Sequence, residues 1–516
     1  MSRYNSKPDI RDELRVFLLS VLGTRDKARV PYRESSSPLL LLPPSRHPRH
    51  SIPQTCYDER RGIYVAPYNE VIFGDKLDDP KVQQEFFDQI HNDGEILEGV
   101  GLPTGRIPRF HELSGLGKLF AAYTLAASRE AYPTVESLCR VRRDPERIEP
   151  EDARWLSRLL VDEDVDWAAN FKINGKDYVF PLTIEERDVV AAATYAAKLF
   201  YDNGGIQTRV NQQYPKAVGM IYFKGREVDN NTWIPGVNAK KVVEKHRKEI
   251  LKMANEGHRH TRALDVIVSD DVIKGDELDY ADGLAPPMNW VTVELVADPG
   301  ESMGATTVST MTEAIAPYIQ RLIKADLYVG CVVSNSFGRL VEAEGSVKIK
   351  DLARRSRETG REWSGEEVAE GIAYLSEWSR DPHRKSTETK GILNGILSLG
   401  NVMRQDTRAI AAAVYNPAII VDDDMHLIPR FHGVQWKRDG DELRGRLKLP
   451  IPCGTVHKEA QEAKMYYKLL GIESADQLAG MMGAVGMASN LSALSMLSTI
   501  GITEGRKRGN GDFAKK

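Results

Sequence analysis

Residues 217–334 carry strand and helix patterns in an order that few folds share. Four runs rich in β-branched and aromatic residues are typical of strands: 217–225, 262–270, 289–297 and 328–334. Two segments have apolar residues at helical spacing: 237–256 and 303–325. The resulting order, β-α-β-β-α-β, predicts a ferredoxin-like split unit.

The loop that precedes the second helix of this unit is a candidate cofactor site. Its glycines let the backbone approach a ligand closely, and the N-terminus of the following helix attracts anions. A dinucleotide pyrophosphate would suit it. The candidate cofactor-binding residues are Gly300, Glu301, Ser302, Met303, Gly304, Ala305 and Thr306. The alternative interpretation is an ordinary strand-to-helix turn that Ser302 caps.

Size and composition limit the classes of protein to which the chain can belong. A chain of 516 residues is too long for one hydrophobic core, so two or three domains are expected. The net charge of −4 and pI near 6.3 do not indicate a nucleic-acid-binding surface. Four scattered cysteines form no zinc or disulfide pattern, and the eleven histidines show no metal-ligand spacing. We therefore expect a cytoplasmic protein without a metal.

Membrane insertion is not expected from the two places where it could be encoded. The N-terminus is charged throughout and does not resemble a signal peptide. Residues 478–503 form a long uncharged run, but this run is rich in Gly, Ser and Ala and contains Asn490 at its middle. That composition favours a buried core helix or helical hairpin over a membrane span.

Glu186 stands before an alanine-rich apolar run. Thr183 and Glu186 have the spacing of a capping box, in which each side chain satisfies a backbone N–H of the other residue. The same carboxylate, at the entrance of a largely apolar helix, could also act as an acid. The residues alone leave both interpretations open.

Two further candidates lie in the C-terminal half of the chain. A helix over 381–397 would place Lys390 and Asn394 on one face, beside Gly391 and Gly395. Asp406 stands where the N-cap of the next helix belongs. A solvated lysine and a simple capping aspartate are the alternative interpretations of these residues.

Several stretches together resemble class II 3-hydroxy-3-methylglutaryl-CoA (HMG-CoA) reductases, in the order of that family. They are "NFKINGKDYVFPLTIEE", "VVAAATYAAKLFYDNGG", "TMTEAIAP", "TKGILNGI", "DTRAIAA" and "AVGMASNLSAL". The resemblance implies a mixed α/β (α+β) fold in which a small dinucleotide-binding domain is inserted in a large CoA-binding domain. The expected division is an extension of unknown role (1–104), the large domain (105–216 and 335–505), the inserted domain (217–334) and a short basic tail (506–516).

The resemblance also implies an activity and roles for individual residues. The family reduces a CoA thioester to an alcohol, HMG-CoA to mevalonate in isoprenoid metabolism, with NADH or NADPH and by way of an aldehyde. Lys390 falls on the family's catalytic cation, Glu186 on its acid and Asp406 on the carboxylate between them. Substrate-binding positions fall on Arg384, Asn394 and Asp188. The family implies a homodimer with active sites at the subunit interface, and neither a nucleic acid nor a membrane as partner.

The chain departs from the family pattern at several places. Arg506 stands where the family has its catalytic histidine, and we expect the flap that normally follows to be missing. The substrate loop at 160–171 looks shortened, Asp188 replaces a serine, and 301–306 differs from the family motif. His457 could replace the histidine. The alternative functions are a non-reductive enzyme acting on another acyl or carbonyl compound, and a pseudoenzyme that binds such a compound.

Overall fold

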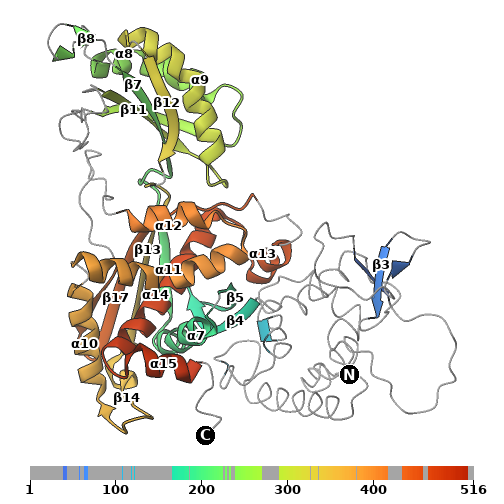
Figure 1. Ribbon diagram of the computed structural model, residues 1–516, viewed down its shortest axis with the longest axis vertical. Helices are drawn as coiled ribbons and strands as arrows, with labels where there is room; N and C mark the ends of the chain where they lie inside the picture. Colours follow the sequence, from blue (N-terminus) through green and yellow to red (C-terminus); the bar gives the residue numbers. More distant parts are fainter. Residues whose placement is uncertain are drawn as a thin grey trace, which may run out of the picture. The chain divides into compact units, whose positions relative to one another are not determined.

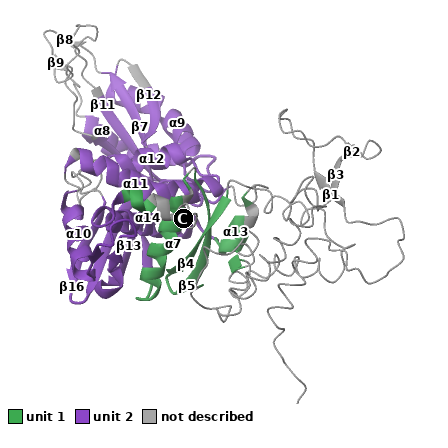
Figure 2. Ribbon diagram, turned by 60° about the horizontal axis from the view of Figure 1, so that its bottom comes forward, with its two compact units in different colours: residues 1–205, 460–472, 502–516 green, residues 206–459, 473–501 purple. Residues whose placement is uncertain are grey.

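The computed structural model describes residues 165–184, 186–224, 239–269, 290–325, 327–334, 336–378, 381–416, 433–456 and 463–509, with a few short segments outside these ranges. The chain divides into two compact units (Figure 2). The first comprises residues 1–205, 460–472 and 502–516, and the second comprises 206–459 and 473–501. Within the extension 1–104, the described elements are the strands β1 (Leu39–Leu42), β2 (Tyr57–Asp58) and β3 (Ile63–Pro67), which form one antiparallel sheet.

A β-hairpin and a helix form the described centre of the first unit. Strands β4 (Val165–Ile173) and β5 (Lys176–Thr183) pair antiparallel. Asn174 and Gly175 connect them with φ values of 50° and 78°, as a tight hairpin turn requires. Helix α7 (Arg187–Tyr201) packs on β4, and α13 (Lys464–Leu470) packs on β5. Helix α15 spans Gly501–Gly509.

The predicted capping box at the start of α7 is wrong. Thr183 is the last residue of β5, where it pairs with Val165 in the hairpin, so its backbone follows the strand. The N-cap of α7 is Glu186 itself, in an extended conformation and without a side-chain capping hydrogen bond. The helix therefore starts three residues later than a cap at Thr183 would place it.

The second unit contains an antiparallel sheet in the order β16-β17-β13-β6. These strands span Val434–Asp439, Glu442–Ile451, Arg339–Lys348 and Ile206–Asn211, respectively. The accompanying helices are α10 (Gly365–Glu377), α11 (Pro382–Val402), α12 (Thr407–Tyr415) and α14 (Ala475–Leu497). Smaller elements are the 3₁₀-helix η6 (Ile349–Leu352) and the paired strands β14 (Arg354–Arg355) and β15 (Glu362–Trp363).

Helix α14 is the core helix that the uncharged run predicts. It packs against β13 and β6 of the sheet as well as against α10 and α11, so every residue from Leu478 to Ser492 is buried. Glycine permits this close packing: a Cβ at Gly480 would lie 2.7 Å from Thr208 Oγ1, and one at Gly486 would lie 2.8 Å from Ile396. Among the described helices, none is long and apolar enough to cross a membrane.

The ferredoxin-like prediction for the inserted domain is confirmed. Its elements follow as β7 (Ala217–Lys224), α8 (Ala239–Asn255), β10 (Arg262–Ser269), β11 (Trp290–Asp298), α9 (Ala305–Ile323) and β12 (Leu327–Ser334). The strands pair antiparallel in the order β10-β11-β7-β12. Figure 1 labels three of them, β11, β7 and β12. Both helices pack on one face of this sheet and form its apolar core with it. A short ribbon, β8 (Glu227–Val228) with β9 (Thr232–Trp233), lies in the β7–α8 connection.

The point of insertion is visible in the strand register. The chain leaves the larger sheet at the end of β6 and returns to it at the start of β13, and these two strands are neighbours. Asn211, the last residue of β6, lies opposite Leu340. The inserted domain therefore occupies the place of a connection between two adjacent antiparallel strands.

Candidate active site

Helix α11 presents two of the predicted site residues to solvent. Pro382 begins the helix, and the Asp381 side chain caps it by accepting hydrogen bonds from the His383 and Arg384 amides. Lys390 and Asn394 then follow four residues apart, so they are neighbours on the helix surface. Lys390 is exposed, and no described residue forms a hydrogen bond or ion pair with its ammonium.

The two glycines beside these residues have different roles. A Cβ at Gly395 would lie 2.5 Å from Ser489 Oγ and 2.7 Å from the Val485 carbonyl oxygen, so Gly395 lets α11 approach α14 closely. A Cβ at Gly391 would meet no atom of the described residues within 4 Å. The space next to Lys390 is therefore open.

Asp406 is the N-cap of α12, as its position predicts. Its Oδ1 accepts hydrogen bonds from the Arg408 and Ala409 amides, and the Arg408 guanidinium lies 3.2 Å from the same oxygen. Burial acts to raise the pKa of Asp406, but the hydrogen bonds from Ala409 and Arg408 outweigh burial and hold this pKa below its usual range. Asp406 is thus a stable carboxylate near neutral pH.

Capping and catalysis by Asp406 can be separated with Asp406→Asn. Asparagine caps helices about as well as aspartate, so we expect the free energy of unfolding to change by only a few tenths of a kcal/mol. If the carboxylate orients the catalytic cation, kcat should fall by about tenfold to a hundredfold. Chemical denaturation and steady-state assays measure the two effects. Asp381→Asn, at the matching cap of α11, is the control. Equal kcat values in both variants would show that Asp406 caps the helix and has no part in catalysis.

Arg384 faces a buried glutamate that the sequence patterns did not single out. Glu388 lies one turn further along α11, its side chain is 1% exposed, and its Oε2 is 3.5 Å from Arg384 Nη2. Asn490 Nδ2 donates to Glu388 Oε1 at 3.2 Å, and Trp436 Nε1 donates to Asn490 Oδ1 at 2.8 Å. Burial raises the pKa of Glu388 to about 7, against the opposing effects of Arg384, Asn490 and the Val434 amide.

Glu186 and Asp188 belong to the first unit, whereas Arg384, Lys390, Asn394 and Asp406 belong to the second. Glu186 is half-buried at the N-cap of α7. Asp188, in the first turn, places negative charge where the helix dipole favours it. Their roles in a common site remain predictions.

The loop 300–306 leads into α9 without a side-chain cap. The N-cap is Gly304, in the left-handed region at φ 102°, and it makes no side-chain capping bond. Ser302 is not the cap, because its hydroxyl donates to the Pro299 carbonyl oxygen three residues earlier. The alternative interpretation of Ser302 is therefore wrong. A Cβ at Gly304 would lie 2.8 Å from the Pro299 side chain, so this turn needs glycine for its own geometry.

A buried arginine fastens this loop to the larger part of the second unit. The Arg339 side chain, 1% exposed, donates to the carbonyl oxygens of Gly300, Ser302 and Cys453. Its Nε also lies 2.8 Å from Asp476.

The carboxylate of Glu301 makes a second link across the same junction. It accepts hydrogen bonds from Thr455 Oγ1 at 2.9 Å and from the Ala475 amide at 2.7 Å. Ala475 is the first residue of α14, so Glu301 joins the loop to the N-terminus of the core helix. These contacts give Glu301 a structural role beside its predicted one.

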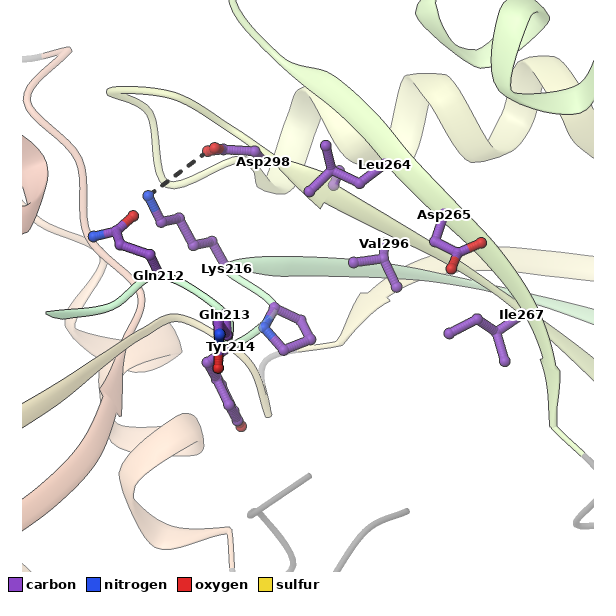
Figure 3. A pocket seen from close by; sticks show the side chains of 11 residues that line it. Gln212, Gln213, Tyr214, Lys216, Leu264, Asp265, Ile267, Val296 and Asp298 are labelled. Carbon is purple, nitrogen blue, oxygen red and sulfur yellow. Dashed lines mark ion pairs between the residues drawn. The ribbon is translucent and has the colours of Figure 1, made fainter. Parts of the chain in front are cut away.

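A cavity of about 150 Å³ lies between the β6–β7 connection and the ends of β10 and β11 (Figure 3). Its lining includes Gln212, Tyr214, Lys216, Ile267 and Asp298. The ammonium of Lys216 lies 4.0 Å from Asp298 and 3.7 Å from Asp476, so its charge is already balanced. The cavity contains none of the predicted site residues.

Comparison with known proteins identifies the family. The sequence profile described as hydroxymethylglutaryl-coenzyme A reductase matches residues 165–510. The chain belongs to the hydroxymethylglutaryl-coenzyme A reductase family. It is thus a reductase-type oxidoreductase, and the predicted resemblance and fold class are confirmed.

Individual relatives agree with this assignment to the reductase family. The 3-hydroxy-3-methylglutaryl-coenzyme A reductase of Archaeoglobus fulgidus is 32% identical over 343 residues, which cover 66% of this chain and 71% of the relative. A probable 3-hydroxy-3-methylglutaryl-coenzyme A reductase of Borreliella burgdorferi is 24% identical over 344 residues, which cover 66% of this chain and 72% of the relative.

Solved structures of HMG-CoA reductases have the same fold. A class II reductase from Streptococcus pneumoniae, bound to NADPH in open conformations, has a TM-score of 0.54 and 29% identity and covers 66% of this chain and 76% of its own. A second structure of the enzyme from this organism has a TM-score of 0.58 and 28% identity. The match covers 77% of this chain and 88% of the chain in that structure.

Proposed function

We propose that this member of the reductase family uses NADH or NADPH to reduce the CoA thioester of a 3-hydroxy-3-methylglutaryl-type acid, or the derived aldehyde, at a site formed by Lys390, Glu186 and Asp406. The observation that carries the proposal is Lys390. It is an exposed ammonium with no described partner, next to the open space at Gly391, on the helix that carries the family's lysine motif. Family membership supports a role of this reaction in mevalonate and isoprenoid metabolism.

The three residues divide the non-redox chemistry among them. The Lys390 ammonium stabilises the negative charge that develops on the carbonyl oxygen. Glu186 supplies a proton to that oxygen. Asp406, whose lowered pKa keeps it ionised, holds the cation and the acid in register. Arg384 and Asn394, on the same helix as Lys390, bind the acyl group, and Asp188 is a further substrate-binding residue.

The start of α9 fits a nicotinamide dinucleotide. A glycine N-cap and the absence of a side-chain cap leave the helix N-terminus suited to a pyrophosphate. A Streptococcus pneumoniae relative is described as bound to NADPH, which supports the same class of cofactor here. When bound, the dinucleotide supplies the reducing equivalents, and residues 300–306 hold its phosphates. We further propose a cytoplasmic homodimer, as the family resemblance implies.

A spectrophotometric assay tests the proposed function. NADH and NADPH oxidation should be followed at 340 nm with HMG-CoA and with mevaldehyde as substrates. Turnover of either substrate with either cofactor supports a reductase. Absence of turnover, together with calorimetric absence of dinucleotide binding, would favour the non-reductive or binding alternative.

The cofactor site can be tested without activity, by Thr306→Glu. Thr306 is exposed in the first turn of α9, where a negative charge stabilises a helix by about 0.3–1 kcal/mol. The same charge should repel a pyrophosphate and raise the Kd for NADH or NADPH by about tenfold or more. Calorimetry measures the Kd, and thermal unfolding measures the stability.

Thr310→Glu is the matched control for this substitution, since Thr310 is exposed one turn further along α9. If the two variants bind the dinucleotide equally well, the phosphates do not lie at the start of this helix. Gly304 is a poorer probe, because any side chain there strains the turn itself.

A further inference from the structure

The pair formed by Arg384 and Glu388 is unusual because several of its buried polar atoms lack partners. Arg384 Nε and Nη2 are buried without a hydrogen bond to any described residue, and so is Glu388 Oε2. The separation of 3.5 Å between Nη2 and Oε2 permits an ion pair but not a well-formed hydrogen bond. The Arg384 side chain is 17% exposed, so part of it reaches solvent, although Nε and Nη2 do not.

The neighbours of Glu388 fix which oxygen can carry a proton. Trp436 Nε1 can only donate, so Asn490 must present its oxygen to Trp436 and its NH₂ to Glu388 Oε1. Oε1 is therefore held as an acceptor. Gly433, at φ 118°, leaves room for it, since a Cβ there would lie 2.6 Å away. A proton on Glu388 would sit on Oε2, on the side of Arg384.

Arg384 is the charged group that faces Glu388 among the described residues. It comes from α11 itself, whereas α14 contributes the uncharged Asn490 and the strand β16 contributes the Val434 amide and Trp436. The ionised form of Glu388 thus depends on one cation. An anion that binds this cation from the solvent side would weaken its hold on Glu388.

We propose that Glu388 is a positioning residue of the acyl-binding site: it holds Arg384 in place before ligand binding, and it takes up one proton on Oε2 when the carboxylate of an acyl ligand binds that guanidinium. The inference rests on the proposed function, because it assumes an acyl group with a free carboxylate at Arg384. The proton comes from solvent, and no other bond is made or broken.

The sign of the pH dependence follows from this exchange. A ligand whose binding takes up a proton binds more weakly as pH rises. With the pKa of Glu388 near 7 before binding, the affinity should fall by about twofold between pH 6 and 7 and by about fivefold between pH 7 and 8, for a pKa well above 8 in the complex. A ligand without a carboxylate should not show this component.

Calorimetric titration with HMG-CoA, in buffers of different ionisation enthalpy, measures both the affinity and the proton uptake. The parent protein should take up about half a proton at pH 7 and nearly one at pH 8. Glu388→Gln keeps the size of the side chain and its hydrogen bond from Asn490 but cannot titrate. It should bind HMG-CoA without this uptake and with no loss of affinity between pH 7 and 8. Glu370→Gln, an exposed glutamate on α10, is the charge-matched control and should behave like the parent.

Acetyl-CoA and free 3-hydroxy-3-methylglutarate separate this proposal from the proposed function. Acetyl-CoA lacks a free carboxylate and should give equal proton uptake in the parent and Glu388→Gln. HMG-CoA binding with equal uptake in the two proteins would overturn the role of Glu388 and leave the reductase intact. If HMG-CoA fails to bind but the free dicarboxylate binds with Glu388-dependent proton uptake, the proposed substrate is wrong and the proposed role of Glu388 is supported. If neither ligand binds, both proposals are overturned.

Discussion

Lys390→Ala is expected to lower kcat by about 10²–10³-fold, because removal of one group that stabilises a developing oxyanion in a preorganised site has an effect of this size. The fold should survive. Lys390 is exposed, no described residue pairs with it, and alanine is a strong helix former in the middle of α11. Steady-state kinetics with the accepted substrate measure the loss, and circular dichroism measures the fold.

Lys350→Ala is the control for this substitution, because Lys350 is another exposed lysine of the second unit and lies outside the predicted site. Its kcat should equal that of the parent protein. If the folded Lys390→Ala variant also retains full turnover, Lys390 is a solvated side chain and the catalytic cation must be sought elsewhere.

Mevaldehyde is expected to be reduced about 10²–10⁴-fold faster than HMG-CoA in single turnovers. Reduction of an aldehyde needs a cation and a proton donor, which Lys390 and Glu186 can supply. Reduction of the thioester must also expel CoA as a thiolate, whose conjugate acid has a pKa of about 8.5. Histidine can protonate such a group near neutral pH, but arginine cannot. General acid catalysis is worth about 10²–10⁴-fold, which sets the expected difference.

Arg506→His tests the cause of this difference. Arg506 lies on α15, and the family resemblance implies that it stands where the family has its histidine. The substitution should accelerate reduction of the thioester selectively. The difference between the single-turnover rates of mevaldehyde and HMG-CoA should therefore become smaller. Equal rates for both substrates in the parent protein would contradict the prediction and indicate an acid other than Arg506. His457, the other candidate for that acid, lies outside the described residues.

The inserted domain could be predicted from sequence because its pattern repeats at each element. Apolar residues alternate along strands such as β7 and recur every three or four residues along α9, and the structure places each element within about two residues of its predicted bounds. The sequence predicts the starts of α7 and α9 less well. Neither predicted cap forms. The pairing of β4 with β5 keeps Thr183 in a strand, and the Ser302 hydroxyl donates to the Pro299 carbonyl oxygen three residues earlier.

The sequence patterns did not reveal that Glu388 is buried, although one residue of the chain indicates that a buried polar partner exists. Glu388 lies beside the lysine motif and resembles an ordinary helix-surface glutamate paired with Arg384 at i, i+4. Its burial depends on α14, whose Asn490 lies 102 residues later in the chain. Asn490, an amide in the middle of the buried part of α14, signals that a polar partner must exist, because buried amides are hydrogen-bonded. Sequence alone does not say which residue provides it.

The register of β6 and β13 makes the larger sheet topologically independent of the domain that interrupts it. Since Asn211 and Leu340 face each other, the two ends of the insertion are only one strand spacing apart, about 5 Å. A tight turn could close that gap. The two ends of the domain lie at the same place. Once the insertion has folded as its own unit, pairing of β6 with β13 therefore does not carry the entropic cost of closing a long loop. The second unit can thus be regarded as a continuous hairpin scaffold whose turn has been expanded into a module.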